Sequence, residues 1–259
     1  MTGQTIQPLD LNPGFPPLLY GRPVLEPHDP FEAAVSAAGS GEAEAGDLFW
    51  SCVQDRISFA VVLEPEVERA RAQEMLFVLM VACADALGAI SPPELAITWT
   101  WPAAIFGNAA RLGDARMAIS DSDDPEGAPD WMVIGLNLAL KPSGEGEPGK
   151  TPEKTTLWDE GAVDVEAVPA LESLSRHFLT WVHRWETDSF KPVHEAWLFR
   201  CDGYRKDVQL GDVAGAFTGL DDKGNLLLKT DGGVESFELL PHLEAGVFAK
   251  PVDAVEAGA

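Results

Sequence analysis

The sequence predicts an α+β protein in which a mixed sheet flanked by helices is followed by a small C-terminal β-barrel of the SH3-like type. Helical and strand patterns alternate up to about residue 188, whereas after Pro192 closely spaced glycines separate short alternating runs. The chain has 259 residues, of which 46% are hydrophobic. That length suits one large and one small domain. We expect domains over 1–188 and 189–245, and a flexible tail over 246–259.

The first third of the chain predicts an extended arm, two helices and two strands. Residues 1–30 are rich in proline and lack periodicity. A helix is expected from Pro30 to Gly39, because Asp29 is a good N-cap and proline suits the first helical position. Strands are expected over 48–52 and 57–63. A long helix over 66–87 should end at Gly88, since its apolar residues follow helical spacing up to that glycine.

The middle of the chain predicts a hairpin, a central strand and a third helix. A strand over 96–101 leads into a hairpin over 105–119. Residues 131–140 are strongly apolar, which is typical of a central strand buried on both faces. The polar stretch 142–156 is expected to be a mobile loop. Residues 169–185 place their large apolar side chains on one helical face.

The C-terminal part predicts the barrel. Strands over 213–220 and 226–230 are joined by the turn Asp221-Asp222-Lys223-Gly224-Asn225. From about Glu244 the pattern is weak, so we expect a frayed tail.

Charge and cysteine content restrict the function classes. Asp and Glu number 42 against 18 Lys and Arg, giving a formal net charge of −24. Such a surface repels phosphate backbones and anionic lipid, so we expect neither nucleic acid nor membrane as a partner. The three cysteines, Cys52, Cys83 and Cys201, form no pair or metal-binding motif. With no apparent signal peptide, a reducing cytoplasm is expected, and no metal site.

Three segments together resemble the catalytic centre of biotin protein ligases. They are Thr98-Trp99-Thr100-Trp101-Pro102-Ala103-Ala104-Ile105, then Gly107-Asn108 with Gly113-Asp114-Ala115-Arg116, and Val133-Ile134-Gly135-Leu136-Asn137-Leu138. In those ligases a strand ends in Lys-Trp-Pro-Asn-Asp, a hairpin carries Asn-Gly and a reactive-site lysine, and a later strand reads Gly-Ile-Asn-Val. The order of elements also matches from about Pro30 to Leu243. The resemblance implies the class II synthetase-like catalytic fold with its C-terminal barrel.

The resemblance also implies a chemistry. These ligases couple a carboxylic acid to ATP and pass the acyl group to a lysine of a carrier domain. A small carboxylic acid or acyl group, with biotin, lipoate or ATP as candidate cofactors, and an acyl-carrier or biotinyl-domain protein are therefore the expected partners. Arg116 lies at the position matched to the hairpin lysine and is the expected catalytic cation. The expected ligand-binding residues are Trp50, Arg56, Trp101, Pro102, Asn108, Gly135 and Asn137.

Two departures from the ligase pattern weigh against classical biotin–ATP ligation. The ligases carry a Gly-Arg-Gly-Arg-Arg-Gly-Arg-x-Trp loop, but the residues before Trp50 include no arginine and three acids. The Lys, Asn and Asp of the Trp-Pro turn fall on Thr100, Ala103 and Ala104, and an alanine cannot help to hold a metal on phosphates. The chain is therefore either an acid-binding or acyl-transferring relative, or a catalytically inactive homologue that binds a small molecule or a protein. Either could be a monomer or a homodimer.

Overall fold

The computed structural model describes residues 12–51, 53–121, 124, 127–142 and 153–252. The strands of the larger sheet are β1 (Tyr20–Val24), β2 (Asp47–Ser51), β3 (Arg56–Leu63), β4 (Ile97–Thr100), β5 (Ala104–Gly107), β6 (Ala110–Ile119) and β7 (Met132–Ala139). Those of the smaller sheet are β8 (Asp207–Leu210), β9 (Val213–Leu220), β10 (Leu226–Thr230), β11 (Gly233–Phe237) and β12 (Lys250–Pro251). The helices are α1 (Pro30–Ser40), α2 (Arg69–Ala72), α3 (Met75–Ile90), α4 (Ala167–Asp188), α5 (Lys191–Arg200) and α6 (Leu239–Ala245).

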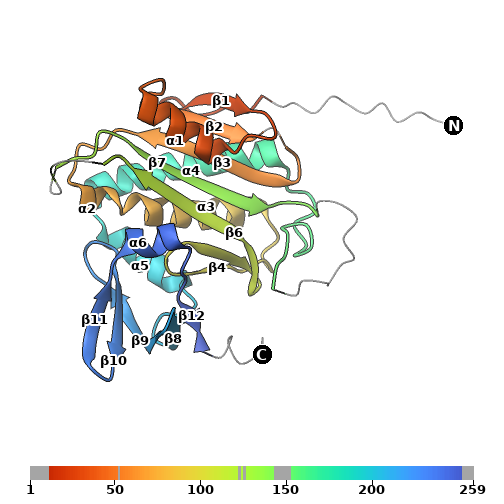
Figure 1. Cartoon of the computed structure of the whole chain (residues 1–259). Helices are drawn as coiled ribbons and strands as arrows, with labels where there is room; N and C mark the ends of the chain where they lie inside the picture. Colours follow the sequence, from red (N-terminus) through yellow and green to blue (C-terminus); the bar gives the residue numbers. More distant parts are fainter. Residues whose placement is uncertain (1–11, 52, 122–123, 125–126, 143–152, 253–259) are drawn as a thin grey trace.

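The predicted fold class is confirmed. The larger sheet has seven strands in the order β1-β2-β3-β7-β6-β5-β4, with β1 parallel to β2 and the other pairs antiparallel. The smaller sheet is antiparallel, in the order β11-β10-β9-β8-β12, and lies below the larger one in Figure 1. Since no pairing joins β11 to β12 among the described residues, a closed barrel stays a prediction.

The larger sheet is buried on both faces. Alternate residues of β3 point to opposite sides: Phe59 and Val61 pack with α3 and α4, whereas Ala60 and Val62 pack with α1. The same alternation holds along β7, the central strand of the seven. Burial on both sides explains the strongly apolar composition of the predicted central strand. Figure 1 shows α1 on one side of this sheet and α3 with α4 on the other.

Helix α1 begins where the sequence predicts. The carboxylate of Asp29 accepts hydrogen bonds from the backbone amides of Phe31 at 2.8 Å and Glu32 at 3.1 Å. Pro30 occupies the first turn, where its missing amide costs nothing. The helix extends one residue beyond the prediction, to Ser40, and ends at Gly41 in the left-handed conformation.

The prediction of one helix over 66–87 that ends at Gly88 is wrong in detail. The helix is interrupted after Ala72, and α3 continues through Gly88 to Ile90. At the interruption the Glu74 side chain is buried and accepts a hydrogen bond from Trp185 Nε1. At the other end, a side chain on Gly88 would meet open space, so nothing in the packing stops the helix there. Tertiary packing of the apolar α3 outweighs the weak helix propensity of one glycine.

Helix α3 is the apolar centre of the protein. By length and composition, the stretch Arg69–Ile90 would be able to cross a membrane, but 72% of its most apolar window is buried within the protein. It packs against α4, α5 and the larger sheet. Its composition is therefore accounted for by its place in the core.

Helix α5 is an element that the sequence analysis missed. The barrel domain was expected from residue 189, but residues 191–200 form a helix, and Pro192 lies in its first turn, where proline is compatible with a helix. Trp197 of α5 is fully buried, and its ring stacks on Trp99 with 5.9 Å between centroids. Helix α5 thereby joins the core of the larger domain.

Strand β4 is the edge of the larger sheet, and C-terminal residues cover its open side. The carbonyl of Trp99 accepts a hydrogen bond from the Asp202 amide at 2.9 Å, and that of Trp101 accepts one from the Ala249 amide at 2.8 Å. The Trp101 indole donates to the Gly224 carbonyl at 3.1 Å. The prediction of a tail frayed from Glu244 is wrong for the described part, since Ala249 is buried and β12 pairs with β8. Residues 253–259 lie outside the described residues.

We predict that the buried carboxyl of Glu74 makes stability depend on pH. Burial raises the pKa of Glu74 from 4.5 to about 7, against a smaller opposing effect of the Trp185 hydrogen bond. Between these two pH values the folded state binds more protons than the unfolded state, so the free energy of unfolding falls as the pH rises. Glu74→Gln, which still accepts from Trp185, should stabilise the protein by roughly 1–3 kcal/mol at pH 8 and by little at pH 4.5.

Urea unfolding at both pH values measures this effect. Glu66→Gln, which neutralises an exposed carboxyl nearby, is the matched control and should show no such dependence. An equal effect of Glu74→Gln at both pH values would show that the carboxyl does not titrate in this range.

Candidate functional site

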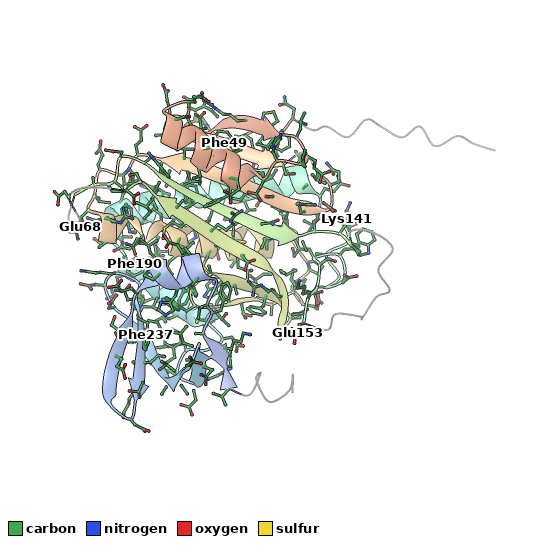
Figure 2. All side chains as sticks on the ribbon, in the orientation of Figure 1. Phe49, Glu68, Lys141, Glu153, Phe190 and Phe237 are labelled. Atoms are coloured by element: carbon green, nitrogen blue, oxygen red, sulfur yellow. The ribbon has the colours of Figure 1, made fainter. Side chains whose placement is uncertain are left out.

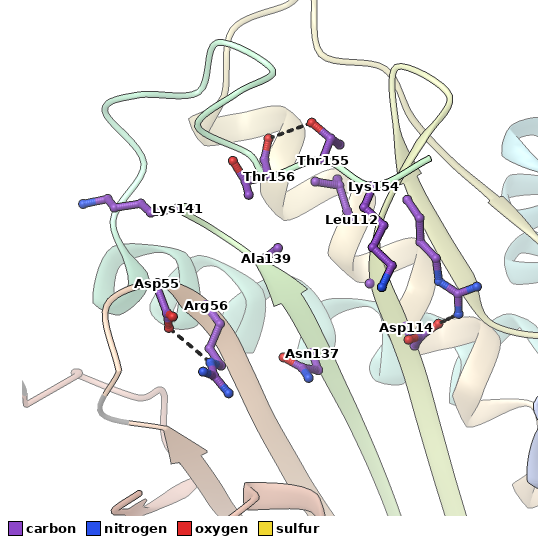
Figure 3. A pocket seen from close by; sticks show the side chains of 12 residues that line it. Asp55, Arg56, Leu112, Asp114, Asn137, Ala139, Lys141, Lys154, Thr155 and Thr156 are labelled. Atoms are coloured by element: carbon purple, nitrogen blue, oxygen red, sulfur yellow. Dashed lines mark hydrogen bonds and ion pairs between the residues drawn. The ribbon is translucent and has the colours of Figure 1, made fainter. Parts of the chain in front are cut away.

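A polar cleft of about 330 Å³ lies where β3 and β6 begin and β7 ends, on the face of the sheet that carries α1. Figure 2 places Lys141 and Glu153, which flank this region, at the opposite end of the molecule from Glu68. The close view in Figure 3 shows the cleft between the three strands and the segment 153–156. Its lining residues are Asp55, Arg56, Arg111, Leu112, Gly113, Asp114, Asn137, Ala139, Lys141, Lys154, Thr155 and Thr156.

The strand register determines which side chains enter the cleft. Asn137 of β7 lies between Ser58 on β3 and Asp114 on β6. Directly opposed residues of antiparallel strands point to the same face, so Asn137 and Asp114 are neighbours on the cleft side. Gly113 allows the strands to approach, because a Cβ atom there would lie 1.9 Å from the Asn137 carbonyl oxygen.

The segment 153–156 forms the outer wall of the cleft. The Arg111 amide donates to the Glu153 carbonyl at 2.9 Å, and the Thr155 amide donates to the Arg111 carbonyl at 3.0 Å. These two bonds fix Lys154 beside the start of β6. Figure 3 shows the Lys154 side chain directed into the cleft toward Asp114. No ion pair involves Lys154 within the part of the chain that the structure describes.

The cleft is cationic although the protein is strongly acidic. Its lining holds four basic side chains, Arg56, Arg111, Lys141 and Lys154, and two carboxylates, Asp55 and Asp114. The whole chain has only 18 Lys and Arg against 42 Asp and Glu. Such a local excess of positive charge favours an anionic group, and Asn137 adds a neutral amide that can orient it.

The two arginines are already oriented by carboxylates. Arg56 Nε lies 3.1 Å from the Asp55 carboxylate. Arg111 forms an ion pair with Asp114, and its guanidinium carbon lies 4.5 Å from the centre of the Phe248 ring. Phe248 belongs to the C-terminal module, by which we mean the smaller sheet with α6 and the segment after it, residues 207–252. This module therefore helps to position a cation of the cleft. Arg56 also lies 3.6 Å from the Glu26 carboxylate. A guanidinium has five donors, so these carboxylate contacts leave others for a ligand.

Arg116, the expected catalytic cation, lies beside this cleft and not in its lining. One of its terminal nitrogens lies 3.0 Å from the Asp29 carboxylate, and the other forms an ion pair with Glu32. Its guanidinium carbon lies 4.1 Å from the centre of the Phe31 ring. Two carboxylates on α1 therefore balance its charge, and its catalytic role stays a prediction.

Of the expected ligand-binding residues, the structure brings Arg56 and Asn137 together in the cleft. Gly135 is the next residue of β7 on the same face, and it pairs with Arg116. Asn108 is exposed in the β5–β6 turn at a φ of 47°, where its side chain accepts from the Ala96 amide and donates to Glu160.

The remaining expected residues lie elsewhere. Trp101 and Pro102 are buried at the contact between the larger sheet and the C-terminal module. Trp50 lines a separate hollow of about 430 Å³ with the N-terminal segment. The binding roles of these three residues stay predictions.

Arg111 and Lys154 are the cleft residues that sequence reasoning missed. A local signal for Arg111 exists, because it is the first cation after the Asn108-Ala109 turn and is followed by the close-packed Gly113. Lys154 has no such signal, since only the fold brings it beside β6. Most of the predicted loop 142–156 lies outside the described residues.

Of the residues that depart from the ligase pattern, the acids before Trp50 lie away from the cleft and Ala104 lies beside it. The acidic residues Glu42 and Glu44 lie near the start of β2, where the Gly46 amide bonds to Val62, at the opposite end of β3 from the cleft. At the cleft end, four residues separate Ser51 from Arg56. Ala104 is fully buried and is paired with Asp114.

The donor set suits a carboxylate or a phosphate group of a ligand. Arg56, Arg111, Lys154 and Asn137 can donate hydrogen bonds to such a group. Both carboxylates of the cleft already contact arginines. Among the described residues, no three His, Cys, Asp or Glu side chains are grouped to hold a metal ion.

Family models match two parts of the chain. The model described as the biotin/lipoate A/B protein ligase family matches residues 15–199. The model described as the biotin protein ligase C terminal domain matches residues 208–250. A curated relative, a biotin–[acetyl-CoA-carboxylase] ligase of Paracoccus denitrificans, is 30% identical over 191 residues, which is 71% of this chain and 78% of the relative.

Solved structures agree with the family match. A biotin protein ligase-like protein of unknown function from Silicibacter sp. TM1040 is 38% identical, with a TM-score of 0.80 over 88% of this chain and 97% of that one. Biotin protein ligase from Aquifex aeolicus has a TM-score of 0.68 at 17% identity, over 85% of this chain and 96% of that one. The second likeness concerns the fold alone.

We predict that Arg111→Ala loosens the segment after α6. Without the guanidinium, Phe248 loses a cation–π contact worth about 0.5–2 kcal/mol. The Ala249 amide, which bonds to the Trp101 carbonyl at 2.8 Å, should then exchange with deuterium roughly two- to thirtyfold faster by local opening. Hydrogen-exchange mass spectrometry of peptides covering 246–252 measures this. Equal exchange in the variant and the natural protein would contradict the coupling.

Proposed function

Because the chain belongs to the biotin/lipoate A/B protein ligase family, we propose that it binds a carboxylic acid or acyl group in the cleft between β3, β6 and β7. The observation that carries this proposal is the gathering of Arg56, Arg111 and Lys154 around Asn137 in a protein of net charge −24. A carboxylate placed among these donors would form charge-assisted hydrogen bonds.

We further propose that ligand binding in this protein does not require ATP. Three observations support this part. The connection between β2 and β3 is too short to close over a nucleotide at the cleft. The acidic residues before Trp50 lie at the other end of β2 and would repel phosphates in any case. Finally, Ala104 offers no ligand for a metal ion, and the carboxylate opposite it, Asp114, is bound to Arg111.

An active ATP-dependent ligase is the second candidate. The 30% identity with the Paracoccus denitrificans ligase favours it. A catalytically inactive homologue that binds a small molecule or a partner protein is the other alternative, and the balanced charge of Arg116 is compatible with it. The experiment below separates these functions.

The partners follow from the proposed ligand. An acyl group bound by its carbonyl or carboxylate end could be received from, or passed to, an acyl-carrier or biotinyl domain.

Cys83 and Cys201 are free thiols, which fits the proposed location in the reducing cytoplasm.

We predict that a carboxylic acid binds and that the cleft cations hold it. Isothermal titration calorimetry with biotin, lipoate, butyrate and octanoate, each with and without ATP and Mg²⁺, measures the affinity. For an acid that binds, Arg111→Ala or Lys154→Ala should weaken binding about tenfold or more, because each removes a hydrogen bond to a charged group. ATP and Mg²⁺ should change the affinity less than about twofold, with no release of pyrophosphate.

Arg22→Ala is the matched control. Arg22 also contacts an aspartate, with 2.6 Å to the Asp47 carboxylate, and also lies over a phenylalanine, but it is on β1, away from the cleft. It should leave the affinity unchanged. Pyrophosphate release in the presence of an acid would favour the ligase, and the absence of binding by every acid would favour the inactive homologue.

A further inference from the structure

The cleft ends abruptly on one side. Asp114 and Asn137 are opposed on β6 and β7, and the next opposed pair on the same face is Arg116 with Gly135. Successive pairs on one face are roughly 7 Å apart. A ligand held at Asn137 and extending along the strands would therefore meet Arg116 and whatever covers Gly135.

Phe31 of α1 covers Gly135. A Cβ atom on Gly135 would lie 3.0 Å from Phe31 Cδ2 and 2.7 Å from the Phe59 carbonyl oxygen, so the ring rests almost on the backbone of β7. The Arg116 guanidinium carbon lies over the same ring, 4.1 Å from its centre. Phe31 and Arg116 thus cover Gly135, and they separate the cleft from a second hollow of about 330 Å³, which they line together with Leu243 and Phe248.

Two carboxylates at the start of α1 hold Arg116 in place over Phe31. Asp29 accepts hydrogen bonds from the first amides of α1 and also binds Arg116 at 3.0 Å. Glu32, in the first turn of the same helix, binds the second terminal nitrogen of Arg116. A guanidinium held by two carboxylates and an aromatic ring is less mobile than a free arginine side chain.

From these contacts we infer that Arg116, packed on Phe31, is a specificity-determining residue that closes the cleft and limits it to short acids or to the carboxyl end of longer ones. The inference rests on the proposed function and deepens it. In this arrangement Arg116 contacts the end of the ligand chain, whereas Arg111 and Lys154 contact the carboxylate. Arg116, which the sequence resemblance matches to a catalytic cation, thus limits the length of the cleft.

The test is the dependence of affinity on chain length. Each methylene buried against apolar surface strengthens binding roughly fourfold. Calorimetry with acetate, butyrate, hexanoate and octanoate should show nearly constant affinity for the natural protein, because added methylenes remain in solvent. In Arg116→Ala, the affinity for octanoate should exceed that for butyrate about tenfold or more.

Two variants serve as controls. Arg116→Met keeps a long side chain and removes the charge, so the affinity should stay nearly independent of chain length. Arg22→Ala, with a similar ion pair and ring contact on β1, should behave as the natural protein does. A gain in Arg116→Met equal to that in Arg116→Ala would show that charge, and not bulk, closes the cleft, and would overturn the inference.

Failure of this inference is distinguishable from failure of the proposed function. One result would contradict the role of Arg116 in limiting chain length and would still support the acid-binding site: the natural protein already binds octanoate at least tenfold more tightly than butyrate, and Arg111→Ala abolishes binding of both acids. If no acid binds to any variant that keeps the melting temperature of the natural protein within a few degrees, both are wrong.

Discussion

The edge strand β4 is the constraint on which the rest of the structure depends. An edge strand exposes unpaired backbone groups, and here residues from the C-terminal part of the chain bind the carbonyl of Trp99 in β4 and that of Trp101 just after it. The Trp101 indole also bonds to the Gly224 carbonyl at 3.1 Å. A Cβ atom on Gly224 would lie 2.3 Å from Phe77 of α3, so the β9–β10 turn can seat there only with glycine. One short strand thereby aligns the two sheets, and it brings Phe248 to Arg111 in the cleft.

Much of the fold is readable in the sequence, because its signals are local. The N-cap of α1, the doubly buried β7 and the turn between β9 and β10 each follow from a few adjacent residues. The errors occur where distant contacts decide. At the interruption before α3, the buried Glu74 carboxylate accepts a hydrogen bond from Trp185, more than a hundred residues away. The continuation of α3 through Gly88 has no such partner, since Gly88 and Ala89 are exposed. The β12 pairing likewise depends on a strand forty residues earlier.

The site was harder to predict, for a physical reason. A motif gives the positions of strands, but the face and the partners of a side chain depend on register. Arg116 and Arg111 are both cations of β6. A sequence does not show that the start of α1 supplies two carboxylates to Arg116, or that Phe248 supplies a ring to Arg111. Asn137 was predictable because a strand motif carries it. Lys154 was not, because a segment outside the strand motifs brings it to the cleft.

A cationic cleft in a protein of net charge −24 has a kinetic consequence. An approaching anion first meets the repulsive field of the whole molecule, and it experiences the four basic side chains only within about a Debye length, ~8 Å at physiological ionic strength. Added salt screens the long-range repulsion more than the short-range contacts. Association of small anions should therefore become faster with moderate salt, whereas association of oppositely charged partners becomes slower. The same negative field would attract cationic protein surfaces from a distance.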